Sequence, residues 1–144
     1  MAKGKRSSRD VIFKMTDTGT VGGGDSLIDF SSQIRGLPGF RREWLSEAHF
    51  PLSSTTEKHD PTGCFRVQDV AITVVVDDTA GTAYRILLAA AAAQTILSLK
   101  AEIGDVHISY DFFVPSDAEE GEGGALIKGQ FTLRCNGNYT KTVV

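Results

Sequence analysis

Alternation of apolar and polar residues with a period of two is the feature that most constrains the fold of this chain. It is clearest in Phe65–Asp77 and recurs in two runs near the C-terminus. Half-apolar strands of this kind belong to antiparallel sheets that cover a core with one face. The residues that share an apolar face are, in order, Val70, Ile72, Val74 and Val76, then Ile108, Tyr110, Phe112 and Val114, then Ile127, Gly129, Phe131, Leu133 and Cys135.

The period changes once, between residues 82 and 94. Tyr84, Leu87, Leu88 and Ala91 recur at spacings of three and four, and the segment contains five consecutive alanines. This pattern predicts one helix at Thr82–Gln94 with a single apolar stripe. Shorter extended runs are expected at Asp10–Thr16, Leu27–Ile34 and Phe40–Glu47, and a further strand at Leu97–Ile103. The expected fold is mainly β: two antiparallel sheets forming a sandwich or barrel, flanked by one α-helix.

Three segments lack periodicity. Residues 1–9 form a basic stretch that we expect to be a flexible N-terminal arm, and residues 10–144 are expected to form one domain. Ala48–Gly63 is rich in Ser, Thr and Pro and is expected to be a long loop, of the kind that is usually functional or disordered. Pro115–Gly124 is expected to be a flexible, acidic hairpin tip.

Composition narrows the classes of function. The chain has 144 residues, 41% of them hydrophobic and 23% charged, which is typical of a globular protein. A net charge of −3 gives no indication of nucleic-acid binding. Cys64 and Cys135 are far apart and form no zinc motif, and Cys135 is expected to be a buried thiol. No segment predicts a signal peptide or membrane insertion, so a cytoplasm-like compartment is expected.

Gly24–Leu27 spells the nucleophile block of the GDSL esterases. In that family the base belongs to a D-x-x-H block, because a serine needs an oriented base to take its proton. None of the three histidines, His49, His59 and His107, has an aspartate three residues before it; those positions hold Ser46, Thr56 and Gly104. Esterase activity is therefore not supported.

Two other motifs fail for equally physical reasons. Gly19–Ser26 approximates a phosphate-binding loop, but Asp25 places a negative charge where the lysine must contact phosphate. The acidic residues between Asp117 and Glu122 lack the alternation and the terminal glutamate of a calcium loop. The histidines share no metal-binding spacing. We therefore expect no catalytic residue, no metal and no cofactor.

Leu27–Trp44 (LIDFSSQIRGLPGFRREW) resembles the opening of the major tail tube proteins of long, non-contractile-tailed bacteriophages. The order of the later elements, from Phe65–Asp77 through the single helix to the closing hairpin Val106–Cys135, agrees with that family, so the resemblance spans residues 10–140. It implies a structural virion protein, not an enzyme, whose hexameric rings stack into a hollow tail tube. DNA would be ejected through the lumen without specific binding.

The resemblance also implies partners and a location. The partners are copies of the chain itself and the tip, terminator and tape-measure proteins of the tail. The chain would be assembled in the cytoplasm of the host bacterium and end in the tail of the virion. Three alternatives stay open: a tail terminator or neck protein, a tube protein of a secretion or injection system, or a small β-barrel binding module that does not assemble.

By the same resemblance, the long loop would contact an adjacent ring or subunit. Trp44 would support its base, and His49, Phe50, Pro51 and Leu52 would be the anchors. The rest of the predicted interface consists of Thr55, Thr56, Glu57, Lys58, His59 and Asp60.

Overall fold

The computed structural model describes residues 11–35, 39–52, 55–121 and 127–144. The predicted arm at residues 1–9 lies outside these ranges. The described elements are the strands β1 (Val11–Met15), β2 (Ile28–Asp29), β3 (Ile34–Arg35), β4 (Arg42–His49), β5 (Lys58–Val67), β6 (Val70–Val75), β7 (Leu97–Ile103), β8 (Val106–Glu120) and β9 (Lys128–Val143), the helix α1 (Ala83–Ala93), and the 3-10 turns η2 (Val21–Gly23) and η3 (Ser31–Gln33).

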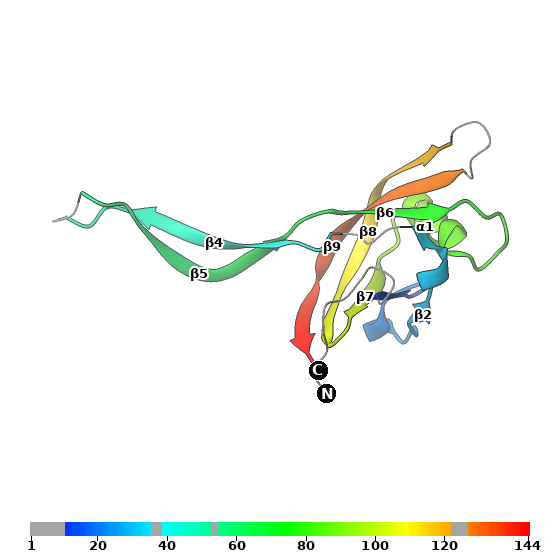
Figure 1. Ribbon diagram of the computed structural model, residues 1–144, viewed down its shortest axis with the longest axis horizontal. Coiled ribbons are helices and arrows are strands. Elements are labelled where there is room, and N and C mark those ends of the chain that lie inside the picture. Colours follow the sequence, from blue (N-terminus) through cyan, green and yellow to red (C-terminus); the bar gives the residue numbers. More distant parts are fainter. Residues whose placement is uncertain (1–10, 36–38, 53–54, 122–126) are drawn as a thin grey trace.

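Two antiparallel sheets contain all of these strands. Seven strands form one curled sheet in the order β2-β1-β7-β8-β9-β6-β3, and β4 and β5 form a separate two-stranded sheet. Figure 1 shows that the β4–β5 hairpin projects far from the body that the other elements form. The predicted class, mainly β with one flanking helix, is confirmed.

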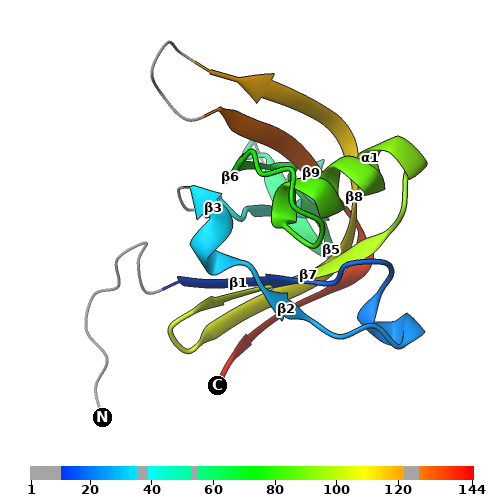
Figure 2. The ribbon, with the colours of Figure 1, turned by 90° about the vertical axis from the view of Figure 1, so that its right-hand side faces the viewer.

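The seven-stranded sheet curls because its two longest strands are interrupted. The pairing of β8 with β9 shifts register between Ser109 and Asp111, at Asp111/Phe112 and again between Phe113 and Ser116. Opposite the first of these shifts, Asn138 has a φ of 56°. Bulges of this kind bend a strand and increase its twist. Figure 2 shows the resulting sheet curving so that α1 lies on its concave side.

Asp111 holds this bend in place. One of its carboxylate oxygens accepts a hydrogen bond from the Ser98 hydroxyl at 2.6 Å, and the other accepts one from the Asn138 side-chain amide at 2.7 Å. The carboxylate thus ties β7 and β9 to β8 at the bend. On either side of the bend the neighbours differ: β7 pairs with the N-terminal half of β8, whereas β6 pairs with the N-terminal half of β9.

The helix forms where the sequence predicts it, and both of its ends are capped. The Thr82 hydroxyl accepts a hydrogen bond from the Arg85 N–H at 3.5 Å, and the Gln33 side chain accepts one from the Ala83 N–H at 2.6 Å. Gln94 takes the left-handed conformation, with a φ of 52°, that ends many helices. The buried face of α1 consists of Ala83, Tyr84, Leu87 and Ala90.

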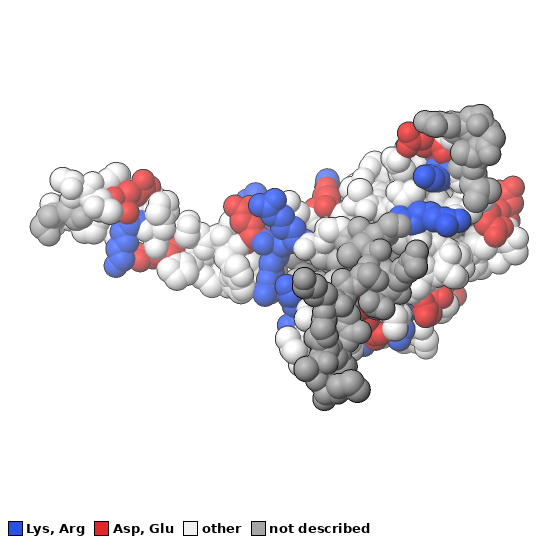
Figure 3. Space-filling model, in the orientation of Figure 1, with Lys and Arg blue, Asp and Glu red and all other residues white. Residues whose placement is uncertain are grey.

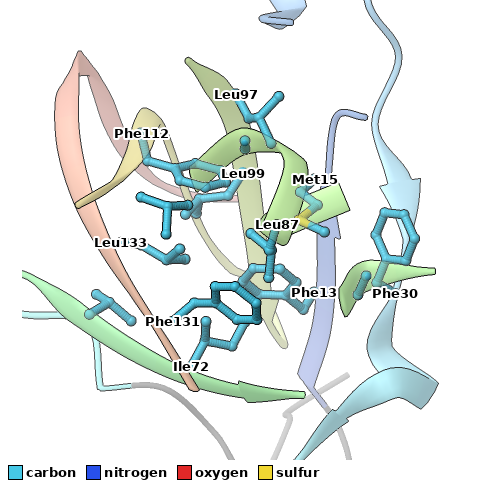
Figure 4. Close-up of a cluster of buried hydrophobic side chains, with 14 of the residues drawn as sticks. Phe13, Met15, Phe30, Ile72, Leu87, Leu97, Leu99, Phe112, Phe131 and Leu133 are labelled. Atoms are coloured by element: carbon cyan, nitrogen blue, oxygen red, sulfur yellow. The ribbon is translucent and has the colours of Figure 1, made fainter. Parts of the chain in front are cut away.

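The core fills the concave side of the sheet (Figure 4). Its largest fully buried side chains include Tyr110, Phe112, Phe131 and Met15. Each such burial contributes about 1.5–3 kcal/mol to stability. The predicted inward face of β8 is confirmed in full, because Ile108, Tyr110, Phe112 and Val114 are all buried.

The predicted inward face of the last strand is confirmed only in its centre. Gly129, Phe131 and Leu133 are buried, but Ile127 is 53% exposed and Cys135 is half-buried. Partial burial raises the pKa of the Cys135 thiol, so the thiol stays protonated at neutral pH. Close packing against the helix explains why position 129 is a glycine, because a Cβ there would stand 2.9 Å from the Tyr84 ring of α1.

The strand predicted at Leu27–Ile34 is wrong in detail. The run Leu27–Ile34 is broken into β2, η3 and β3, because the Asp29 carboxylate accepts hydrogen bonds from the N–H and hydroxyl of Ser31 and forms a local turn. These bonds also hold the pKa of Asp29 below its usual value. Phe30 is buried but Ile28 is 41% exposed, so the two do not share one inward face.

The other boundary errors lie at Phe65–Asp77 and at Pro115–Gly124. The first range is divided between the end of β5 and the whole of β6. The second is not a flexible tip as far as Glu120, because β8 continues to that residue and pairs with β9 from Ser116 to Glu120. Residues 122–126 lie outside the described ranges.

Candidate assembly surface: the projecting hairpin

The predicted interface residues lie on the β4–β5 hairpin. The two strands pair from Arg42↔Val67 at the base to His49↔Lys58 at the outer end. Trp44 is near the base, and His49 ends β4. Phe50, Pro51, Leu52, Thr55, Thr56 and Glu57 belong to the tip, and Lys58, His59 and Asp60 are the first residues of β5. The structure therefore brings the predicted set together on one element.

The prediction that Ala48–Gly63 is a loop without periodicity is wrong. Half of this range is strand, because β4 extends to His49 and β5 begins at Lys58, and residues 50–57 connect the two strands. Pro61, which argues against a strand, pairs with Ser46 in a ribbon of only two strands. Because each strand of such a ribbon has an unpaired outer edge, a proline there can lack an N–H without losing a ladder hydrogen bond.

A bulge near the middle adjusts the twist of the hairpin. The register shifts between Trp44 and Ser46, and the Leu45 carbonyl accepts a hydrogen bond from the Thr62 hydroxyl at 2.9 Å. Gly63 follows with a φ of +78°, a conformation that favours glycine. The bulge thus accounts for the Thr62-Gly63 pair in the sequence.

Large apolar side chains on the hairpin are exposed to solvent. Trp44 is 55% exposed, Phe50 is 65% exposed and Leu52 is fully exposed. A two-stranded hairpin without a hydrophobic face against other elements is at best marginally stable in water. Exposed apolar residues gathered on one projection are typical of a surface that binds another protein.

The base of the hairpin is anchored by an aromatic cluster. The Arg42 guanidinium lies 4.9 Å from the Trp44 ring centre, 5.2 Å from that of Phe65 and 5.4 Å from that of Tyr139. The Trp44–Phe65 and Phe65–Tyr139 ring pairs are 5.0 and 5.2 Å apart, and Tyr139 stacks on the buried Tyr110. We call Arg42, Trp44, Phe65 and Tyr139 the hinge cluster. It connects the hairpin to the core by contacts worth about 0.5–1.5 kcal/mol each.

Charged groups near the tip form a small exposed network. His49 Nδ1 lies 3.3 Å from the Asp60 carboxylate, Lys58 lies 3.8 Å from the same carboxylate, and His59 Nε2 lies 3.7 Å from Glu57. Both signs appear close together at the tip in Figure 3. Exposed pairs of this kind contribute little to stability.

Sequence reasoning missed three members of the hinge cluster. Arg42 and Trp44 are two residues apart on one strand and therefore share a face, which was a usable signal. Phe65 stands opposite Trp44 only because of the hairpin register, and Tyr139 comes from the last strand. Contacts between residues so far apart in the chain require the fold to be known.

Other kinds of site find no support in the part of the chain that the structure describes. No group of three or more His, Cys, Asp or Glu residues there could hold a metal ion. No helix in that part is long and apolar enough to cross a bilayer. Two of the histidines lie at the hairpin tip and the third, His107, on β8.

No known family and no curated protein matches the sequence, but solved structures match it from end to end. A chain in the tail of an empty gene transfer agent (GTA) particle, which has C6 symmetry, superposes with a TM-score of 0.74 at 10% identity, covering 96% of this chain and 100% of that one. The SPP1 tail tube gives a TM-score of 0.71 at 10% identity, covering 97% of this chain and 80% of that one.

A chain of the anti-feeding prophage (AFP) baseplate is also similar, with a TM-score of 0.70 at 8% identity, covering 100% of this chain and 99% of that one. The protein therefore has the fold of the tail tube proteins found in phage tails and related particles. The resemblance that the sequence indicated is confirmed at the level of the fold.

Proposed function

We propose that this chain is a structural subunit of the tail tube of a phage or phage-derived particle, in which hexameric rings stack into a hollow tube. The observation that carries the proposal is the end-to-end match with a chain from a C6-symmetric tail, covering 96% of this chain and all of that one. Because nearly the whole of each chain takes part, the likeness is not limited to a shared substructure.

The hairpin gives the proposal independent support. A long ribbon with exposed apolar side chains at its tip is unfavourable in an isolated protein. Docking on another copy would remove these side chains from water. We propose that the tip residues Phe50, Pro51 and Leu52, with His49 and the segment from Thr55 to Asp60, contact an adjacent subunit or ring, and that Trp44 supports the hairpin base.

The proposed role has consequences for partners. The tube would meet the tip, terminator and tape-measure proteins of a tail, be assembled in the cytoplasm of the host bacterium and become part of the particle. DNA would pass through the lumen without being held. The net charge of −3 is compatible with such passage, because a strongly basic wall would bind phosphates and slow the DNA.

Electron microscopy of the purified chain tests the proposal. We expect rings or hollow filaments in negative stain at high protein concentration, with six-fold symmetry in end views. The fraction of protein in particles should rise with concentration, as measured by analytical ultracentrifugation. A chain that stays monomeric at all concentrations, with neither rings nor filaments, would contradict the proposal.

A second candidate is a tube or terminator subunit of a contractile injection system. It is favoured by the AFP baseplate match and by a match at TM-score 0.61 and 8% identity to a structure described as an injection-system sheath/tube terminator. The two candidates differ in the length of the product: a tube subunit stacks ring on ring, whereas a terminator stops at a single ring. The same micrographs separate them.

A further inference from the structure

The second interruption of the β8–β9 ladder places an Asn-Gly dipeptide in a bulge. Asp111 pairs with Gly137 and Phe112 pairs with Cys135, so Asn136 is an extra residue without a partner across the ladder. A bulge leaves its extra residue outside the regular pairing and bends the strand. Gly137 has a φ of +128°, a conformation that favours glycine. The bend thus explains why a glycine follows Asn136.

An asparagine that precedes a glycine can react with its own backbone. The amide nitrogen of the next residue attacks the side-chain carbonyl carbon, a carbon–nitrogen bond forms, and the displaced amide group takes up a proton and leaves as ammonia. Water then opens the succinimide ring at either carbonyl, which gives aspartate or isoaspartate. The reaction consumes only water. Glycine favours the attack because it has no Cβ to hinder the approach of its nitrogen.

The fold leaves the reacting groups of Asn136 and Gly137 accessible. Both residues are exposed, and the Asn136 side chain makes no hydrogen bond to any residue that the structure describes. A Cβ at Gly137 would meet nothing within 4 Å, so no neighbour obstructs ring closure. Gly137 also lines a cavity of about 410 Å³ between β9 and the end of β5, which has room for the water that the second step consumes.

Asn138 shows the opposite arrangement only two residues further along β9. Its side-chain nitrogen donates a hydrogen bond to the Asp111 carboxylate at 2.7 Å, which restricts rotation of the side chain. The next residue is Tyr139, whose ring packs against those of Phe65 and Tyr110. The Cβ and the packed ring of Tyr139 hinder the approach of its backbone nitrogen to Asn138. The chain therefore contains an internal comparison for the reaction.

The position of the bulge determines what isoaspartate would change. In isoaspartate the backbone runs through the former side chain, so β9 gains one backbone carbon between Cys135 and Gly137. The residues that follow would be displaced relative to β8, with which Thr140–Val143 pairs. Tyr139 lies in this part of β9 and belongs to the hinge cluster, and β9 passes the base of the hairpin here (Figure 1).

We propose that Asn136 is a site of spontaneous covalent modification in the folded chain, where attack by the Gly137 nitrogen converts the asparagine through a succinimide to aspartate and isoaspartate. Formation of isoaspartate loosens the attachment of the hairpin base. The proposal goes beyond the tube function and does not depend on it, because the reaction needs only one copy of the chain.

Peptide mass spectrometry of the full-length chain tests the site. Cleavage after Arg134 and Lys141 by trypsin releases one peptide, Cys135–Lys141, that contains both asparagines. After incubation of the folded chain in warm, mildly alkaline buffer, fragmentation of this peptide should place the loss of the amide at Asn136, severalfold faster than at Asn138. The rate at Asn136 should be similar to that of the chain unfolded in guanidinium chloride, because the bulge gives no protection.

Amide hydrogen exchange tests the effect on the hairpin base. In the incubated chain, the amides of Tyr139–Val143 and those of β4 near Trp44 should exchange severalfold faster than in the fresh chain. Asn136→Gln is the matched control, because it keeps an exposed amide but would have to close a larger, less favourable ring. This variant should fold normally by far-UV circular dichroism, keep its amide and show no change in exchange on incubation.

The outcomes separate the two parts of the proposal. Retention of the Asn136 amide in the folded chain, under conditions in which the unfolded chain loses it, would overturn the site; equal rates at Asn136 and Asn138 would do the same. Conversion of Asn136 with unchanged hydrogen exchange would overturn the effect on the hairpin base.

Discussion

Arg42 shows how one residue can set the direction of a whole element. Its guanidinium contacts three aromatic rings, two on the hairpin and one on the last strand of the body. The stack continues through Tyr139 to Tyr110, whose pKa is raised by burial. A hairpin tethered only by its two connecting strands could swing, whereas these contacts fix its base against the sheet.

We therefore predict that Arg42→Ala loosens the hairpin base. Amide hydrogen exchange of β4 near Glu43 and Trp44 should accelerate severalfold, and the free energy of unfolding should fall by about 1 kcal/mol. Arg66→Ala is the control, because Arg66 is exposed on the same ribbon and lies over none of the described aromatic rings. Equal exchange rates in the two variants would show that the hinge cluster has no role in fixing the base.

A second prediction concerns the contact between Gly129 and the helix. In Gly129→Ala the new Cβ would stand 2.9 and 3.0 Å from two atoms of the Tyr84 ring and 3.2 Å from the Phe131 ring. Overpacking at such a site costs about 1–3 kcal/mol, measurable by urea denaturation. Gly22→Ala, where a Cβ meets nothing within 4 Å, should be close to neutral.

The same contact can be checked by a double-mutant cycle. If the ring of Tyr84 is what opposes the new methyl group, Gly129→Ala should cost less in a Tyr84→Leu background than in the original chain. Strict additivity of the two changes would contradict this explanation and place the cost elsewhere.

At the scale of elements, the hairpin and the body have different requirements. The body is held by a core that includes Phe112, Phe131 and Leu133, all fully buried. The hairpin has no core and depends on its ladder, the hinge cluster and the proposed contact with a second copy. Changes at its tip should therefore affect assembly and leave the folding of the body unchanged.

Shortening the hairpin tests this separation. His49 and Lys58 are directly opposite each other, so residues 50–57 can be replaced by Asn-Gly, a two-residue turn that suits a hairpin. The free energy of unfolding of this variant should lie within about 0.5 kcal/mol of that of the original chain, as expected for a surface change. The amount of tube, measured by sedimentation, should fall at least tenfold. Tubes of normal length and yield would show that the tip has no part in assembly.

A milder variant controls for the length of the hairpin. Phe50→Ser with Leu52→Ser keeps the tip and removes its two most exposed apolar side chains. It should also reduce tube formation, whereas Val21→Ser, at an exposed apolar residue of η2, should not.

At the scale of the whole molecule, local patterns predicted most of the body. The period-two face of β8 and the helix between Thr82 and Gln94 are properties of short stretches, and the structure has them as predicted. The outer part of the hairpin, residues 48–63, is predicted as a loop because apolar and polar residues do not alternate there. A ribbon exposed on both sides has no buried face that would require such alternation. The hinge cluster depends on which distant strands become neighbours, and no local pattern contains that information.

The overall charge leads to a prediction about nucleic acid. With a net charge of −3, the assembled chain should bind duplex DNA more weakly than about 100 µM at physiological salt. Electrophoretic mobility of labelled duplex in the presence of preformed tubes measures this. Retention of DNA that weakens steeply with added salt would indicate a basic lumen and contradict free passage.

The position of Trp44 allows assembly to be followed by intrinsic tryptophan fluorescence. It is the sole tryptophan of the chain, and its side chain is 55% exposed. Its ring centre lies 4.9 Å from the Arg42 guanidinium, at the junction between the β4–β5 hairpin and the body. Indole emission responds to solvent and to nearby cations, so it will change when the junction moves or when a neighbouring copy covers it. Polymer growth can thus be followed in real time by intrinsic fluorescence, without a dye.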